Sequence, residues 1–367
     1  MDFYGYMRPN GKAGARNYVL LLPVNRSLNF IASNVERMTR NTRHFEIPAE
    51  TGRTEVDREV IARTLIGLMN NANVGGIVLL AVKSGAGSAY KNMCAERFEE
   101  EARKTGKPFR IVYLTNVGGS YNMLGETLRL TREVLLEVSD FRRENCPLSA
   151  LTLGVKCGTS DATSGIAGNP CVGAAFDQLI RAGGTAFFSE TTEIIGAEDL
   201  VAKRAVNESV AKKILSAAKH WEDKAKATGE DIRKINPIPA NIAAGISSLE
   251  EKSLGAIAKS GTSPIQDVLK YAEMPKGSGL YFVDSWMSSL SLPLCLTACG
   301  ATIMLYQMGG GKIAQHPMMP SINPTVVSPF LYLTGNAIAY SRAPDNFDFD
   351  ASPIMTEGAS KIGRAHV

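Results

Sequence analysis

A dense set of small polar residues follows an apolar, strand-like run in the segment LGVKCGTSDATSGIAGNP, residues 153–170. The segment carries one thiol, Cys157, and one carboxylate, Asp161. A thiolate and a carboxylate are both ligands for divalent metal ions, so these two side chains are candidate metal contacts. The segment therefore predicts a ligand-binding loop between a strand and a helix.

The same loop offers hydrogen-bond donors to an anion. Its glycines let the main chain approach a ligand, and Ser160, Ser164 and Asn169 lie near the start of a helix whose first amides suit a carboxylate. An ordinary strand-to-helix turn has the same composition, because Gly and N-cap residues favour turns for their own reasons. In that alternative Asp161 or Asn169 is an N-cap, and Cys157 is a buried small apolar side chain.

A second segment, SETTEIIGAE at residues 189–198, brings carboxylates off a strand into the start of a helix. Glu190 and Glu193 can bind a divalent cation or act as acid and base. The alternative is that these acidic residues stabilise a helix N-terminus through its dipole.

A third segment, SSLEEKSLGAIAKSGTSP at residues 247–264, carries Lys252 and Lys259. A lysine in a closed site can neutralise a substrate carboxylate or, when desolvated, act as a base. A charged Glu-Glu-Lys triplet is also typical of a solvated helix face.

The composition is that of an ordinary globular protein and excludes several classes of function. The 367 residues are 44% hydrophobic and 21% charged, and the formal net charge of +4 forms no basic stripe, so we expect no nucleic-acid partner. No apolar run approaches the roughly 18 residues of a membrane span, and the start does not resemble a signal peptide, which predicts a cytoplasmic protein without membrane contact. The six cysteines form no Cys-x-x-Cys pair and are expected to be free thiols.

Apolar, β-branched runs bounded by Gly or polar residues predict buried parallel strands. They cover residues 17–24, 75–82, 109–117, 150–157, 183–190, 279–286 and 300–306. Helical patterns lie between these runs. They cover residues 57–71, 88–106, 124–145, 168–183, 207–229 and 263–273. The alternation indicates an α/β fold, with parallel or mixed sheets covered by helices.

A break between two consecutive α/β units is expected at the segment CPLS, residues 146–149. The first unit is predicted to be an N-terminal domain of residues 1–145. The second is predicted to be a C-terminal domain of residues 146–360, which carries the main site motifs.

Three predicted strands of the second unit end in polar side chains, at Cys157, Glu190 and Asp284. Ligands of open α/β sheets lie beyond the carboxyl ends of the strands. We therefore expect the three loops that follow these strands to form the walls of one site.

The last seven residues, KIGRAHV at 361–367, back-translate into the start of a common sequencing adapter. We expect them to be a read-through artefact and the natural chain to diverge near Ser360 and continue further. His366 is therefore not a candidate ligand.

Three motifs in this order resemble the altronate/galactarate dehydratase family. They are GYMRPNGKAGARNYVLLLPV, then KCGTSDATSGIAGNPCVGAAFDQLI with GGTAFFSETTEIIGAE, and then LEEKSLGAIAKSG. The resemblance implies a lyase that removes a group β to a carboxylate from a small hydroxy acid. It also implies a divalent metal cofactor, with Fe2+ as the first choice and Mn2+ or Mg2+ as alternatives.

Departures from the sugar-acid dehydratases are similar to those of the large (beta) subunits of sulfolactate sulfo-lyases, a branch of the family. The Cys expected after the first strand is absent from LPVNRSLN, the expected His- and Cys-containing turn reads HFEIPAETGR, and the expected TGRG reads QMGGG. That branch also has a CPLS segment before its KCG loop. The resemblance therefore implies loss of sulfite from 3-sulfolactate, which gives pyruvate.

Two other functions stay open from the sequence. One is a hydro-lyase that dehydrates a sugar acid such as altronate or galactarate, and the other is a non-catalytic paralogue that binds a hydroxy acid or a subunit. The CGTSD, SETTE and EEKSLG segments occur together, which favours an enzyme. The core motif begins at residue 5, without the small N-terminal domain of the dehydratases, so the resemblance implies a separate small alpha subunit in an oligomer.

The expected reaction requires a base at the carbon that bears the carboxylate and hydroxyl, and positive charge beside the developing enolate. Glu190 and Glu193 are the first candidates for the base, since burial raises the pKa of a carboxylate, and Lys252 is the next. The metal, or Lys252 and Lys259, would hold the carboxylate and the enolate.

The remaining substrate oxygens are assigned to the loop of residues 158–169. Ser160, Ser164 and Asn169 would bind them together with main-chain amides of this loop. Arg16 would supply a further anion contact.

Overall fold

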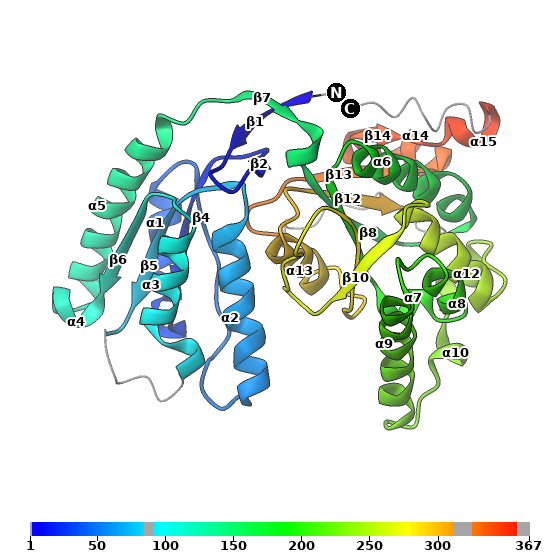
Figure 1. Ribbon diagram of the computed structural model, residues 1–367, viewed down its shortest axis with the longest axis horizontal. Coiled ribbons are helices and arrows are strands. Elements are labelled where there is room, and N and C mark those ends of the chain that lie inside the picture. Colours follow the sequence, from blue (N-terminus) through cyan, green and yellow to red (C-terminus); the bar gives the residue numbers. More distant parts are fainter. Residues whose placement is uncertain (1, 84–90, 311–324, 358–367) are drawn as a thin grey trace.

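A computed structural model describes residues 2–83, 91–310 and 325–357 of the chain. The segment 361–367, which we predict to be foreign, lies outside these residues. Two lobes lie side by side, and each is built on a parallel sheet with helices on its faces (Figure 1). The predicted α/β fold is therefore confirmed.

The N-terminal lobe contains a four-stranded parallel sheet in the order β4-β3-β5-β6. The strands are β3 (Tyr18–Pro23), β4 (Thr42–His44), β5 (Val74–Ala81) and β6 (Phe109–Tyr113). The helices are α1 (Asn29–Met38), α2 (Glu55–Asn70), α3 (Ala95–Lys104), α4 (Leu114–Val117) and α5 (Ser120–Ser139).

Both faces of this sheet are buried, which explains the continuous apolar runs of its strands. Val19 and Leu21 of β3 pack with residues of α1 and α5. Leu20 and Leu22, which point to the opposite face, pack with residues of α2 and α3.

The C-terminal lobe contains a seven-stranded parallel sheet in the order β10-β11-β9-β8-β12-β13-β14. The strands are β8 (Thr152–Gly158), β9 (Thr185–Phe188), β10 (Ile265–Leu269), β11 (Gly279–Val283), β12 (Ile303–Met308), β13 (Phe330–Thr334) and β14 (Phe349–Asp350). The longer helices are α6 (Asn169–Arg181), α9 (Glu208–Lys226), α12 (Leu249–Ile257) and α13 (Ser291–Cys299). The short helices are α7 (Thr191–Ile194), α8 (Glu198–Ala202), α10 (Ile232–Ile235), α11 (Pro239–Ala243), α14 (Ala337–Arg342) and α15 (Pro353–Glu357).

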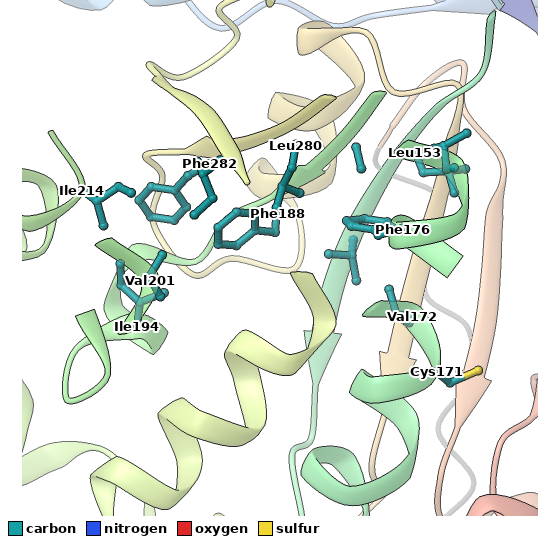
Figure 2. Close-up of a cluster of buried hydrophobic side chains, with 14 of the residues drawn as sticks. Leu153, Cys171, Val172, Phe176, Phe188, Ile194, Val201, Ile214, Leu280 and Phe282 are labelled. Carbon is teal, nitrogen blue, oxygen red and sulfur yellow. The ribbon is translucent and has the colours of Figure 1, made fainter. Parts of the chain in front are cut away.

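The main core of this lobe lies on the face of the sheet that α6 and α9 cover, and part of it is shown in Figure 2. Phe188 of β9 and Phe282 of β11 stand side by side, with ring centroids 5.1 Å apart. Phe176 of α6 and Ile214 of α9 pack into the same cluster. The opposite face packs against α13.

One predicted helix is wrong: residues 263–273 contain the edge strand β10, which pairs in parallel with β11. The apolar side chains of Ile265, Val268 and Leu269 are spaced as in a helix. The register shifts between Ile265 and Asp267, and this irregularity places Ile265 and Val268 in the core on one face and Leu269 in the core on the other.

The chain passes between the lobes through a small antiparallel sheet. β1 (Asp2–Met7) pairs with β2 (Ala13–Gly14) and with β7 (Glu144–Pro147), which leads into the C-terminal lobe. The strands of the N-terminal sheet all precede β7 and those of the large sheet all follow it. This arrangement agrees with the division near residue 145, which stays a prediction.

The lobes also meet where α2 packs against α13 (Figure 1). Asn71 Nδ2 donates to the carbonyl oxygens of Thr297 (2.9 Å) and Ala301 (2.8 Å). Asn73 Nδ2 donates to the carbonyl oxygen of Thr302 at 2.8 Å. These bonds join the N-terminal lobe to the amino end of β12.

Two chemical expectations can be compared with the structure. All six cysteines are free thiols, as predicted. Among the described residues, no helix combines the length and the apolar character that crossing a membrane requires.

The contact between α2 and α13 gives a prediction for Gly67. A Cβ atom there would lie 2.1 Å from the carbonyl oxygen of Ala298, so Gly67→Ala should force the helices apart and lower the free energy of unfolding by about 1–3 kcal/mol. Gly125→Ala in the exposed part of α5 is the control, because a Cβ meets no atom within 4 Å there and Ala should stabilise the helix by up to about 1 kcal/mol. Denaturant titration measures the free energy of unfolding of both variants. If Gly67→Ala stabilised the protein as much as Gly125→Ala, the close contact between α2 and α13 would be contradicted.

Candidate active site

The structure brings Cys157 and Glu190 together, as expected for the ends of neighbouring parallel strands. Cys157 lies near the end of β8, and Glu190 follows β9. The main-chain N–H of Cys157 donates to Glu190 Oε2 at 3.2 Å. Asp284, at the third strand end, instead accepts from Thr191 Oγ1 (2.7 Å) and Trp221 Nε1 (2.8 Å), and so supports the start of α7.

A buried group of charged side chains surrounds this contact. The group, hereafter the ion cluster, consists of Lys156, Cys157, Glu190, Glu193 and Lys259. Lys156 Nζ donates to Glu190 Oε1 at 2.5 Å, and Lys259 Nζ donates to Glu190 Oε2 and, at 3.1 Å, to Glu193 Oε2. Two ammonium groups thus balance two carboxylates. Unpaired charge is costly at this depth, so the four side chains depend on one another.

The thiol of Cys157 lies among these charges. It donates to Glu193 Oε2 at 3.1 Å, and its Sγ is 3.2 Å from Lys259 Nζ. Burial, followed by the negative charges of Glu190 and Glu193, raises the pKa of Cys157 far above its usual value. Within this cluster Cys157 is therefore a neutral thiol at neutral pH.

The expectation that burial raises the pKa of a glutamate base is wrong for Glu193. Burial does act in that direction, but the ammonium groups of Lys259, Lys156 and Lys252 outweigh it and lower the pKa of Glu193 to about 2. Glu193 is thus ionised but weakly basic while these lysines face it.

Glu190 has an unusual backbone conformation. Its φ of 75° and ψ of 64° lie in the left-handed region, and its side chain is fully buried. For a residue other than Gly this conformation costs about 1–3 kcal/mol and is typical of functional sites. The main chain turns here from β9 into α7.

The position of Lys259 is set by a turn after α12 that two side chains hold. Asp177 of α6 accepts from the main-chain N–H groups of Thr262 (2.9 Å) and Ser263 (2.9 Å). Arg204 donates to Ser260 Oγ (2.8 Å) and to the carbonyl oxygen of Ser263 (3.0 Å). The main chain next to Lys259 is therefore fixed, and only its side chain is free to change position.

A pocket of about 520 Å³ lies between the loop after β8 and α12. Five residues that were expected at the site line it. They are Ser160, Asp161, Ser164, Asn169 and Lys252. Apart from Arg16, the predicted site residues thus fall into two groups, those of the pocket and those of the ion cluster. Lys252 links the groups, because it lines the pocket and its charge acts on Glu193.

Asp161 belongs to the pocket wall and not to the ion cluster. Its carboxylate accepts from the N–H of Ser164 (3.0 Å), from Thr163 Oγ1 (2.6 Å) and from Asn336 Nδ2 (2.8 Å). These bonds fit the N-cap alternative, in which Asp161 orders the turn before α6. The structure does not bring Asp161 to Cys157 as a shared metal contact.

Two pocket residues have amide or ammonium groups in well-defined positions. Asn169 Nδ2 donates to the carbonyl oxygen of Gly255 at 2.8 Å, while Asn169 Oδ1 is buried without a hydrogen-bond partner. Lys252 Nζ donates to Asn236 Oδ1 (2.5 Å) and Asn241 Oδ1 (3.0 Å). A buried acceptor without a partner needs an explanation, and a ligand hydroxyl is one.

Arg16 lies away from both groups. Its main-chain N–H donates to Asn73 Oδ1 at 3.0 Å, and its Nη1 donates to the carbonyl oxygen of Ala15. Asn73 bonds Thr302, near the amino end of β12, whereas Cys157 lies near the carboxyl end of the neighbouring β8. The structure therefore places Arg16 at the opposite edge of the sheet from the ion cluster.

The sequence analysis missed Lys156. This lysine interrupts the apolar run of β8, is buried, and donates to the carbonyl oxygen of Cys157 as well as to Glu190. A lysine inside a strand that is buried on both faces needs an anionic partner. That anomaly was the signal that could have identified it.

The ion cluster contains a donor set that fits a divalent metal. Each side chain of Cys157, Glu190 and Glu193 offers one donor atom, and these three atoms lie within 4.8 Å of one another. All three side chains are buried. A thiolate with two carboxylates suits first-row divalent ions such as Fe2+ or Mn2+. The fit requires movement of Lys259, because its ammonium contacts all three side chains.

Family models and known proteins match almost the whole chain. Residues 5–139 match the model described as D-galactarate dehydratase/altronate hydrolase, second domain. Residues 148–365 match the model described as D-galactarate/altronate dehydratase, C-terminal.

Three curated relatives have similar identities. The (2R)-sulfolactate sulfo-lyase subunit beta of Chromohalobacter salexigens is 33% identical over 359 residues, which cover 96% of this chain and 87% of the relative. The altronate dehydratase of Bacillus subtilis is 32% identical over 97% of this chain and 70% of its own length. The galactarate dehydratase (L-threo-forming) of Escherichia coli is 31% identical over 84% of this chain and 62% of its own length. The chain therefore belongs to the galactarate/altronate dehydratase family of lyases.

Proposed function

We propose that the chain is the large subunit of a lyase that removes sulfite from 3-sulfolactate. The observation that carries the proposal is the pair of lysines whose charges act on Glu193: Lys252, which lines the pocket, and Lys259, which bonds Glu193 in the ion cluster. A substrate with a carboxylate and a sulfonate carries two negative charges, which the ammonium of Lys259 faces together with Lys252, whose side chain becomes an ammonium as it takes up the C2 proton. The 33% sequence identity to a sulfolactate sulfo-lyase subunit beta, over 96% of the chain, supports the same assignment.

The reaction removes a proton from C2 and breaks the bond between C3 and sulfur. The electrons of the C2–H bond form the C2–C3 double bond, and the electron pair of the C–S bond leaves with sulfite. The enol of pyruvate then takes a proton at C3 and loses the proton of its hydroxyl, which leaves the C2 carbonyl. Sulfite is a stable anion and leaves without an acid, whereas hydroxide requires protonation or a metal.

Lys252 is the base in this proposal, in place of the glutamates that the sequence favoured. Glu190 and Glu193 are bonded to lysines, and the pKa of Glu193 is lowered to about 2. Lys252 lines the pocket, and its partners Asn236 and Asn241 are uncharged amides. From this position Lys252 would accept the C2 proton directly from a substrate in the pocket.

The other pocket residues hold and orient the substrate. Asn169 Oδ1 accepts the C2 hydroxyl, which gives this buried oxygen the partner that it lacks within the chain. Ser160 offers a hydroxyl at the pocket wall, and Ser164 keeps the loop in place through its bonds with Asp161. Lys259 supplies positive charge beside the carboxylate.

Cys157, Glu190 and Glu193 are the residues that would hold a divalent metal, with Fe2+ as the first candidate and Mn2+ or Mg2+ as alternatives. When bound, such an ion supplies a Lewis acid that stabilises the negative charge of the enolate. A separate small subunit completes the enzyme in this proposal. The name of the relative, subunit beta, and the name of the N-terminal family model, second domain, support that partner.

The proposal predicts the products of an assay. The chain, co-expressed with its small subunit and supplied anaerobically with Fe2+, should release sulfite and pyruvate from 3-sulfolactate in equal amounts. Altronate and galactarate serve as competing substrates, since two dehydratases are nearly as similar to the chain. A 2-oxo sugar acid without sulfite would replace the proposal with a hydro-lyase, and folded, metal-loaded protein that releases neither product would overturn it.

The assignment of Lys252 predicts a specific effect of Lys252→Arg. Arginine keeps the positive charge but cannot act as a base at neutral pH, so kcat should fall by about 10²–10⁴-fold while KM changes little. Lys212→Arg, at an exposed position of α9 that contacts Glu208, is the matched control and should keep full activity. Steady-state kinetics with 3-sulfolactate measure both variants, and an unchanged kcat for Lys252→Arg would exclude Lys252 as the base.

A further inference from the structure

We infer that Lys259 and a divalent metal exclude each other from the triad of Cys157, Glu190 and Glu193. In this arrangement Lys259 is an internal cation that occupies the metal position. Metal binding then requires the ammonium of Lys259 to leave the triad. The inference concerns the occupancy of the site and does not depend on which group the lyase eliminates.

The contacts of Lys259 place its ammonium among the three donor side chains. Lys259 Nζ is 3.2 Å from Cys157 Sγ and 3.1 Å from Glu193 Oε2, and it also donates to Glu190 Oε2. Metal–ligand bonds are shorter, about 2.3 Å to a thiolate and about 2.0–2.2 Å to a carboxylate for Zn2+. A metal ion bonded to the same three side chains would therefore lie among them, in the space that Nζ occupies. The two cations cannot share this space.

The charges of the ion cluster lead to the same conclusion. Lys156 and Lys259 already neutralise Glu190 and Glu193. A divalent ion added to this balanced group would leave two positive charges uncompensated in a buried site. If Lys259 leaves and Cys157 binds as a thiolate, the ion and Lys156 together balance the two carboxylates and the thiolate.

Lys259, and not Lys156, is the lysine that gives way. Lys156 Nζ donates to the carbonyl oxygen of Cys157 and to Glu190 Oε1, and so bonds the side chain of one member of the triad. Lys259 contacts all three donor side chains. Its main chain cannot follow, because Asp177 and Arg204 hold the residues that come next. The exchange is thus a rotation of one side chain.

The inference predicts that Lys259→Met binds metal more tightly than the unchanged chain. Methionine has a similar length but no charge, so the competing cation is lost. The probe is Co2+ under anaerobic, reducing conditions, and the readout is the thiolate-to-cobalt absorption band. We expect the dissociation constant for Co2+ to fall at least about tenfold, which corresponds to about 1.4 kcal/mol. Equal or weaker binding by Lys259→Met, with the band present, would overturn the inference.

Two controls identify the site and the charge effect. Cys157→Ser should remove the thiolate band, because it removes the sulfur ligand. Lys212→Met, which removes an exposed lysine 73% accessible in its side chain, should leave the Co2+ affinity unchanged. A tenfold change in the Co2+ affinity of Lys212→Met would show that loss of any positive charge alters metal binding. It would contradict the competition between Lys259 and the metal.

A second measurement uses the unchanged chain and so does not depend on the folding of a variant. Lys259 should react faster with a lysine-acetylating reagent when Co2+ is bound, because its ammonium has left the buried triad; mass spectrometry of peptides reports the labelling. Lys107, which is buried and donates to the carbonyl oxygens of Met69 and Asn71, is the internal reference and should stay protected. Labelling of Lys259 that does not change with saturating Co2+ would also overturn the inference, whatever the result of the turnover assay.

Discussion

The pairing of Glu190 with Lys156 and Lys259 is the interaction on which the rest of the site depends. Both carboxylate oxygens of Glu190 accept from an ammonium, and the side chain is fully removed from water. Removal of one member of such a pair typically costs about 3–5 kcal/mol, because the partner is left charged and buried. Its lysines also keep Glu193 ionised, whereas burial, followed by the charges of Glu190 and Glu193, keeps the thiol of Cys157 protonated.

The surrounding strands and helices hold the side chains of the ion cluster in position. Parallel pairing of β8 with β9 sets Cys157 beside Glu190, and the left-handed backbone of Glu190 turns the chain into α7. α12 contributes Lys252, and the turn that follows α12 contributes Lys259. The ion cluster is thus assembled from three separate stretches of sequence. A hydrophobic core on each side of the sheet supports these stretches.

Much of the fold could be predicted from the sequence, because buried parallel strands read as continuous apolar runs. Each of the seven predicted strands contains a strand of the structure, although residues 114–117 of one form α4. The strands β1, β2, β4, β7, β13 and β14 were not predicted, and the irregular register of β10 imitates helical spacing. The contact between Cys157 and Glu190 followed from their strand ends, whereas Asp284, which was expected in the same site, bonds Thr191 and Trp221 instead. Lys156 was overlooked although a lysine inside a buried strand indicates an anionic partner, and the pKa of Glu193 depends on lysines that are distant in sequence or hidden in a strand. The position of Arg16 could not be predicted from the order of the motifs, because a residue type does not indicate which end of the strands the residue will lie near.

The bonds that Asn71 and Asn73 make with the main chain of residues 297–302 lie near the amino end of the strands, and the pocket lies near the carboxyl end. Assembly of the two lobes and recognition of the substrate are therefore physically separated by the length of a β-strand. Changes in the pocket loops need not disturb the asparagine bonds that join the lobes. Such a separation lets one scaffold accommodate leaving groups as different as water and sulfite during the divergence of a family, since the cost of each new pocket is confined to one end of the sheet.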